Sequence, residues 1–271
     1  MSLRTDLISE KSNFRDDLNG VTTKTFSSGD TVLQYAEIKN ENAAKKLEKP
    51  MGKYYTVKFP RVDTLTDFYD IEHFLVTALD DLLPDCREQV MVVGLGNRDI
   101  TPDSLGPLTA DGIIATRHIS NSIKKQTGLE SLRAVSSLIP GVLGKTGIEA
   151  SIGIKAISES IKPTAVIVID ALAAQSPNRL CTTFQLTNTG ISPGSGVNNA
   201  RKAFDKSTFG VPVIAIGMPT VIDYELNENE TMMVTPKDID MLIKKSAKIL
   251  SDTLNGFLQP DTDKEILTAL S

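Results

Sequence analysis

The pattern of apolar and polar residues changes character near residue 84. Residues Thr22–Lys39 alternate loosely about a Ser-Gly-Asp turn, which predicts a β-hairpin. Tyr54–Phe59 predicts a further strand, and apolar residues at helical spacing between Phe68 and Leu82 predict a helix. We therefore expect residues 1–84 to form an N-terminal elaboration made of a hairpin and a helix.

From Gln89 onward, strand patterns alternate with helical ones. Three continuous runs of mostly β-branched residues are typical of strands that are covered on both faces, as in a parallel sheet. These runs are Val90–Val93, Ala165–Ile169 and Val211–Ile216. Arg133–Leu138 and Cys181–Leu186 are weaker runs, and we expect them to be edge strands.

The last helix has the clearest start signal in the sequence. Thr235 is the predicted N-cap, Pro236 the first helical residue and Asp238 an acidic residue in the first turn. Apolar residues from Ile239 to Phe257 recur at helical spacing and predict its buried face.

These elements predict one α/β domain over residues 1–271. The alternation of covered strands and helices predicts a βαβ sheet domain with an N-terminal elaboration. We expect the α/β core in residues 89–258, after the elaboration of residues 1–84, and a C-terminal tail in residues 259–271.

Composition excludes several classes of protein. The 271 residues are 40% hydrophobic and 23% charged, unlike a disordered chain. The sequence shows neither an apolar run long enough to span a membrane nor a signal peptide. Two cysteines without a CxxC pair fit a reducing cytoplasm, and a net charge of −5 argues against nucleic-acid binding. We expect a cytoplasmic enzyme or binding domain.

Two glycine-rich segments fall short of nucleotide-binding motifs. Gly94-Leu95-Gly96-Asn97 follows a strand, but the third glycine of a dinucleotide fingerprint is replaced by Asp99. Gly141–Thr146 resembles a phosphate loop, but Ile139 stands where that motif requires its first glycine. We therefore predict no nucleotide cofactor.

Serine and metal chemistry are also poorly supported. Gly190-Ile191-Ser192-Pro193-Gly194 matches G-x-S-x-G, but a proline after the serine cannot donate the backbone N–H of an oxyanion hole. The only two histidines are His73 and His118, and both precede the serine. With no HExxH or CxxC pair, we predict no metal site and no cofactor.

Two aspartates follow predicted strands. Asp103 lies in the loop that leaves the first strand, and Asp170 ends the second. Parallel strands would bring both to the carboxyl edge of the sheet, where two close carboxylates share a proton and can activate water. Asp103 is also typical of a helix N-cap and Asp170 of a turn cap, and spacing alone favours these structural roles. The catalytic interpretation stays open beside them.

Twelve sequence blocks, in order along nearly the whole chain, resemble the germination protease of endospore-forming bacteria. The blocks are Arg4-Thr5-Asp6-Leu7, Val93–Asn97, Thr101–Pro107, Thr116-Arg117-His118, Pro140–Gly144, Thr146–Glu149, Ile169–Ala174, Thr189-Gly190-Ile191, Pro193–Val197, Ile214–Gly217, Pro219-Thr220-Val221 and Val234–Lys237. Their number and order make the resemblance specific.

The resemblance implies an endopeptidase that begins the degradation of small acid-soluble spore proteins during germination, in the spore core. It implies a fold similar to the hydrogenase-maturation proteases, which is a three-layer sandwich around a mainly parallel sheet with a catalytic core. It also implies a homotetramer made as a zymogen and an aspartate-dependent reaction. The two aspartates of that family fall on Asp103 and Asp170. We expect water to attack the scissile bond, with no direct nucleic-acid or membrane partner.

Backbone amides near these aspartates are the predicted donors to an oxyanion. One group lies in the loop after the first strand, and the other lies in the later glycine-rich loop. The predicted residues are Gly94, Gly96, Asn97, Gly190, Gly194 and Ser195.

The chain departs from the family pattern at Lys145, Asn188, Ser192 and Asn198, where glutamine, aspartate, histidine and glycine are usual. Two alternatives stay open. One is a maturation-type protease that recognises a metal, although a chain with two histidines offers few ligands for it. The other is a catalytically inactive scaffold, which the changes at Lys145, Asn188 and Asn198 keep open.

The segment Thr5–Glu10 looks similar to the acidic, hydrophobic, small, Ser-Glu pattern that the family cuts in its substrates. Our hypothesis is that the enzyme trims itself there or holds this segment in its own cleft. We expect the N-terminal elaboration of residues 1–84 to include a short pro-segment.

Overall fold

The computed structural model describes residues 5–11, 14, 18–83, 87–191, 203–227, 230–262, 266 and 269. Its strands are β1 (Val21–Ser28), β2 (Thr31–Ile38), β3 (Gly52–Lys58), β4 (Gln89–Gly94), β5 (Ala134–Leu138), β6 (Ala165–Ala174), β7 (Thr183–Thr187), β8 (Val213–Asn227) and β9 (Glu230–Val234). Its α-helices are α1 (Glu41–Leu47), α2 (Tyr69–Leu82), α3 (Leu105–Asp111), α4 (Asn121–Thr127), α5 (Leu143–Thr146), α6 (Ala150–Ile161), α7 (Lys206–Phe209) and α8 (Ile239–Leu258). Short 3₁₀ helices are η1 (Ile8–Glu10), η2 (Thr101–Asp103) and η3 (Pro177–Arg179).

In the described part of the chain, all strands join one sheet. The order is β1-β2-β3-β7-β8-β6-β4-β5, and β9 pairs with β8 outside this path. β8, β6, β4 and β5 are parallel, whereas β1, β2, β3 and β7 extend the sheet in antiparallel pairs. The predicted α/β class is confirmed, with a core of four parallel strands that is extended by the antiparallel strands β7, β3, β2 and β1.

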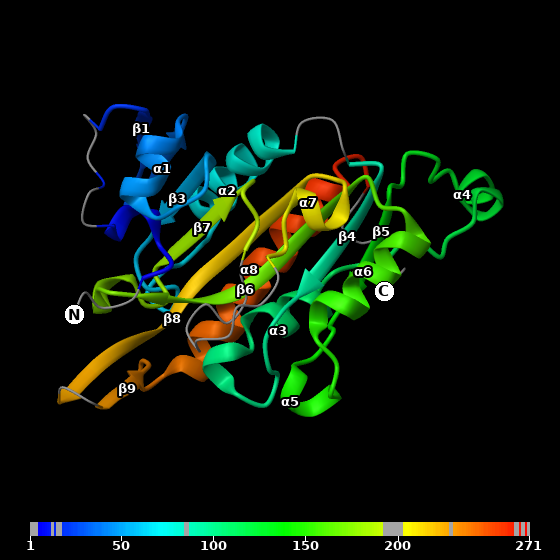
Figure 1. Cartoon of the computed structure of the whole chain (residues 1–271). Helices are drawn as coiled ribbons and strands as arrows, with labels where there is room; N and C mark the ends of the chain where they lie inside the picture. Colours follow the sequence, from blue (N-terminus) through cyan, green and yellow to red (C-terminus); the bar gives the residue numbers. More distant parts are fainter. Residues whose placement is uncertain are drawn as a thin grey trace.

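Helices cover both faces of the parallel strands, and Figure 1 shows α8 on one face and α6 and α7 on the other. Alternate side chains of β4 explain this arrangement, because Val90 and Val92 join the core under α2 and α8. Met91 and Val93 pack on the opposite face with Ile154 of α6. A strand buried on both faces reads as a continuous apolar run, so the predicted three-layer sandwich is confirmed.

Several elements have the predicted positions, but two differ. The hairpin, the strand near Tyr54, α2 and the edge strand β5 are confirmed. The prediction that Cys181–Leu186 is an edge strand is wrong, because β7 lies between β3 and β8. Thr235 is not the N-cap of the last helix, since α8 begins at Ile239 and the Thr235 hydroxyl donates to the Thr220 carbonyl at 2.8 Å.

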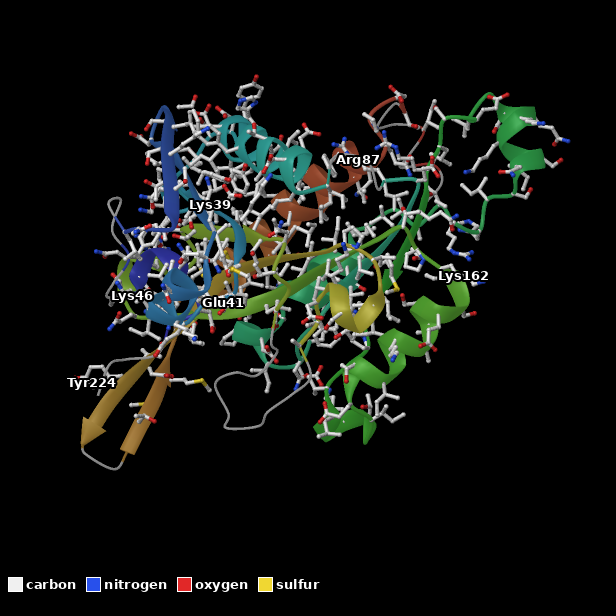
Figure 2. The ribbon with its side chains drawn as sticks, turned by 45° about the horizontal axis from the view of Figure 1, so that its top comes forward. Lys39, Glu41, Lys46, Arg87, Lys162 and Tyr224 are labelled. Atoms are coloured by element: carbon white, nitrogen blue, oxygen red, sulfur yellow. The ribbon has the colours of Figure 1, made fainter. Side chains whose placement is uncertain are left out.

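The sequence pattern also missed an arm formed by the end of β8 and by β9. β8 continues to Asn227, well beyond the predicted end, and pairs antiparallel with β9. Tyr224 and Met233 are 56% and 66% exposed on this arm. Figure 2 shows Tyr224 on the arm, away from the body of the molecule. None of the helices in the described ranges has the length and apolar character needed to cross a membrane.

Candidate active site

The connection from β4 to α3 is built around glycines. A Cβ atom on Gly94 would lie 2.2 Å from the carbonyl oxygen of Gly106, and one on Gly106 would lie 2.2 Å from the Leu95 oxygen and 2.5 Å from the Ile169 oxygen. Only glycine permits such close backbone contact. The glycines after β4 therefore let α3 pack onto the sheet, which explains them without a nucleotide.

The same connection positions Asp103. Gly96 has φ +113°, and a Cβ atom there would lie 2.1 Å from the Asp103 carbonyl oxygen. The loop can fold back onto Asp103 because residue 96 is glycine. The Asn97 amide then donates to Asp103 Oδ2 at 2.7 Å. Gly96 and Asn97 thus lie at the site, where they hold the Asp103 carboxylate in place.

Asp170 lies within β6 and does not end it, which corrects the predicted position. The strand continues to Ala174 because β8 runs beside it, pairing Asp170 with Gly217 and Ala174 with Ile222. On its other side, the last pair with β4 joins Ile169 to Gly94. Asp170 therefore lies one residue beyond the end of β4. Its side chain is 8% exposed, and its Oδ1 accepts from the Ala171 amide at 2.9 Å.

Asp103 and Asp170 line one cavity of about 640 Å³. The other lining residues come from the loop after β4, from α5 and the residues before it, from the start of α6, from β6, β8 and β9, and from Phe204 and Thr235. Among them are Ile100, Pro102, Val142, Leu143, Leu172, Phe204, Val221 and Met233, which are apolar. Glu149 is a third carboxyl residue of the lining. Asp103 and Asp170 in this largely apolar cavity provide groups that can activate a water molecule and protonate a leaving amine.

A second cavity of about 410 Å³ shares Asp170 with the first. Its lining is mixed, and its polar side chains include Lys49, Tyr54, Gln185 and Asp205. Burial raises the pKa of the Tyr54 phenol to about 12, so this side chain stays neutral at physiological pH. Hydrogen bonds, first of all from the Ser207 hydroxyl, lower the pKa of Asp205.

The N-terminal segment 5–11 lies against this second cavity. Leu7 is fully buried and packs with Leu172 and Ala174 on β6. The Asp6 amide donates to the Ala173 carbonyl at 2.9 Å, and the Ala173 amide donates to Asp6 Oδ2 at 2.8 Å. The segment is thus bound along the end of the strand that carries Asp170.

Other predicted residues lie elsewhere. Gly94 is buried in β4 and does not line the Asp103 cavity, whereas Gly190 lines the second cavity with φ +79°. Gly194 and Ser195, and the departures Ser192 and Asn198, lie outside the described residues.

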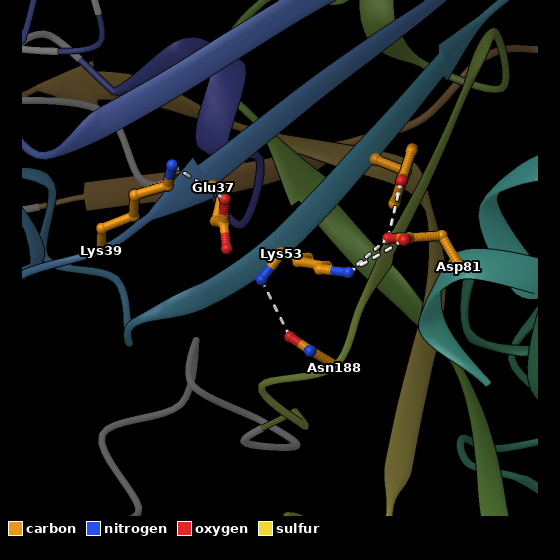
Figure 3. A network of polar contacts seen from close by, with 6 residues as sticks. Glu37, Lys39, Lys53, Asp81 and Asn188 are labelled. Atoms are coloured by element: carbon orange, nitrogen blue, oxygen red, sulfur yellow. Dashed lines mark hydrogen bonds and ion pairs between the residues drawn. The ribbon is translucent and has the colours of Figure 1, made fainter. Parts of the chain in front are cut away.

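The two described departures from the family pattern make local contacts. Lys145 forms an ion pair with Asp99, which joins α5 to the loop after β4 at the rim of the cavity. Asn188 Oδ1 accepts from the Lys53 amide at 2.9 Å, and Lys53 Nζ pairs with Asp81 at 2.8 Å (Figure 3). Both departures therefore stabilise the scaffold beside the site.

Sequence reasoning missed Lys49 and Gln185. Lys49 lies between α1 and β3, and Gln185 lies on β7, so only the folded sheet brings them beside Asp170. No spacing or motif marks either residue. Among the described residues, no group of three His, Cys, Asp or Glu side chains is placed to hold a metal ion.

Comparison with known proteins identifies relatives along the whole chain. Residues 3–232 match the family model Peptidase_A25, described as germination protease. A germination protease of Clostridium tetani is 36% identical over 98% of this chain and 98% of that protein. A germination protease of Oceanobacillus iheyensis is 40% identical over 87% of this chain and 63% of that protein.

A search of solved structures finds a [NiFe] hydrogenase maturation protease, HycI, from Thermococcus kodakarensis. It is 18% identical, with a TM-score of 0.42, and the match covers 67% of this chain and 98% of that one. The assignment of the family depends on the sequence matches, which extend through β4, β6 and both candidate aspartates. The resemblance expected from the sequence blocks is confirmed, and the chain belongs to the germination protease family.

Proposed function

We propose that this protease cleaves small acid-soluble spore proteins in the core of the germinating spore, using Asp103 and Asp170. The observation that carries the proposal is that both carboxylates line one cavity, at the point where β4 ends and β6 continues. Family membership supports a protein substrate. The resemblance to the family further supports a homotetramer made as a zymogen.

The proposed reaction needs one carboxylate and one carboxylic acid. The ionised aspartate takes a proton from water as the water oxygen attacks the peptide carbonyl carbon. The protonated aspartate then gives its proton to the leaving amine as the C–N bond breaks. Because the two groups share one proton, activity should follow a bell-shaped pH profile that belongs to the pair.

The test is mass spectrometry of a small acid-soluble spore protein after incubation with the full chain. We expect defined cuts, reduced at least about 1,000-fold in Asp170→Asn and Asp103→Asn, because each variant removes one member of the proton-transfer pair. Asp30→Asn, an exposed change in the turn between β1 and β2, is the matched control and should retain activity within about threefold.

A chelator control separates metal dependence from aspartate dependence. Cleavage that persists in Asp170→Asn, or that disappears only with chelator, would contradict the proposed mechanism. Light scattering on the same sample measures the number of subunits.

A further inference from the structure

The carbonyl oxygen of Asp6 is held by two side chains from different parts of the sheet. Lys49 Nζ donates to it at 2.8 Å, and Gln185 Nε2 donates to it at 3.1 Å. Gln185 is only 7% exposed, so its amide is held in the body of the protein. A peptide carbonyl within segment 5–11 therefore has an ammonium and an amide as donors.

The orientation of the Gln185 amide follows from its second partner. The Ile8 backbone amide donates to Gln185 Oε1 at 2.8 Å. A backbone N–H can only donate, so the atom that faces Ile8 must be the oxygen. The Nε2 group must then face Asp6, and the pair of contacts holds the backbone on both sides of Leu7.

Carboxylate contacts fix where the segment lies along β6. Asp6 Oδ2 accepts from the Ala173 amide, as described above, and Glu10 accepts from the amides of Gln175 at 2.7 Å and Ser176 at 2.9 Å. Leu7 fills an apolar site between these polar contacts. The binding site therefore matches an acidic residue, an aliphatic residue directly after it and a glutamate four positions after the acidic one.

The held carbonyl lies beside a candidate catalytic group. Asp6, Lys49, Gln185 and Asp170 line the same cavity of about 410 Å³. When water attacks a peptide carbonyl, negative charge develops on the carbonyl oxygen. An ammonium and a buried amide N–H aimed at that oxygen are suited to stabilise this charge.

We propose that a substrate peptide takes the place of segment 5–11, and that Lys49 and Gln185 hold the carbonyl oxygen of the bond to be cut. This proposal rests on the proposed function and adds two residues to it. The peptide follows the path of segment 5–11, including its turn at Ile8–Glu10, in the register set by Ala173, Gln175 and Ser176.

The step balances without a cofactor. Water adds to the carbonyl carbon and gives one proton to the basic aspartate, while the carbonyl electron pair moves onto the oxygen held by Lys49 and Gln185. The electron pair on that oxygen then re-forms the carbonyl double bond as the C–N bond breaks. The leaving amine takes a proton from the acidic aspartate. Lys49 keeps its own proton throughout, so its role is electrostatic.

The test is steady-state cleavage of a small acid-soluble spore protein by Lys49→Met, which removes the ammonium and keeps the apolar stem. We expect kcat to fall about 100- to 1,000-fold, as for loss of one oxyanion donor, with KM changed less than about threefold. Lys49→Arg restores a cationic donor, and its kcat should be at least about tenfold higher than that of Lys49→Met. Lys45→Met, on the exposed face of α1, is the matched control and should match the unaltered enzyme.

The outcomes separate this proposal from the proposed function. If the unaltered chain cuts the spore protein and Lys49→Met cuts it equally fast, the proposal is wrong and the function stands. If Lys49→Arg is as slow as Lys49→Met, a charge-stabilising role is also contradicted. If neither the unaltered chain nor the same chain trimmed at its N-terminus cuts the spore protein, the proposed function fails and this proposal fails with it.

Discussion

The two cavities that share Asp170 are lined by different chemistry. The Asp103 cavity has carboxylates in largely apolar walls, whereas the cavity beside segment 5–11 presents donors such as Lys49 and Gln185. The first is suited to proton transfer and the second to holding a peptide backbone. A single buried aspartate on β6 lies at the boundary, so the strand that carries the chemistry also carries the contacts to the peptide.

The largest effect should come from disturbing the cavity that contains both carboxylates. In Gly96→Ala, the new methyl group would lie 2.1 Å from the Asp103 carbonyl oxygen, at a φ of +113° that alanine avoids. Asp103 must then move, and a shift of about 1 Å in a catalytic group costs roughly 100-fold in rate. Steady-state kinetics of spore-protein cleavage should show this loss in kcat/KM.

Gly128→Ala is the control for backbone strain. Gly128 has φ +71°, but a Cβ atom there would meet nothing within 4 Å. Gly128→Ala should have a lower free energy of unfolding in urea and an unchanged kcat/KM. Equal kcat/KM in the two variants would show that Gly96 does not position Asp103.

A smaller effect is expected from loosening segment 5–11 in the other cavity. Glu10→Gln replaces a carboxylate that accepts from two backbone amides, at 2.7 and 2.9 Å, and hydrogen bonds to charged groups contribute about 1.5–3 kcal/mol. If a substrate must displace the segment, weaker docking lowers KM about tenfold with kcat unchanged. Cleavage kinetics measure KM and kcat. The control is Glu130→Gln, at an exposed residue shortly after α4. An unchanged KM would mean that segment and substrate do not compete.

The smallest effect should come from Asp205, which lines the second cavity but caps α7. Its Oδ1 accepts from the Thr208 amide at 2.9 Å and the Ser207 hydroxyl at 2.6 Å. Asp205→Ala should lower the free energy of unfolding by about 1 kcal/mol at pH 7 and leave kcat unchanged.

The pH dependence of this effect follows from the lowered pKa of Asp205. A depressed pKa in the folded state gives stability that is present above the ordinary value of 3.8 and lost as the pH falls through the folded value. Urea unfolding should therefore show a smaller difference in the free energy of unfolding at pH 3 than at pH 7 between the unaltered chain and Asp205→Ala. A difference that is the same at both pH values would contradict the ionised cap.

The sequence predicted those parts of the fold that have a local signal. The runs at β4, β6 and β8 are apolar because both faces of these strands are buried, and α2 has its apolar residues on one face. The central position of β7 has no such signal, because its partners β3 and β8 are set by long-range pairing. The end of β6 was misplaced because Ala171–Ala174 lack β-branched residues, although pairing with β8 extends the strand.

The candidate site divides in the same way. Asp103 and Asp170 follow recognisable strands, so topology alone suggested that they meet at the carboxyl edge. Lys49 and Gln185 contact segment 5–11 across 43 and 179 residues of sequence, and nothing in their neighbours marks them. The glycine roles were predicted as oxyanion donors, whereas the structure shows Gly94 in helix packing and Gly96 in the placement of Asp103.

The long sequence separation between segment 5–11 and its binding site also has a consequence for biosynthesis. Glu10 precedes Gln175 by 165 residues, and Ile8 precedes Gln185 by 177. At about 5–20 residues per second, a ribosome completes that binding site roughly 10–30 s after it has made the segment. Each new chain therefore passes through a period in which the segment exists and its binding site does not. Docking is a late event in folding, and the undocked segment is accessible to chaperones and proteases before the sheet has formed.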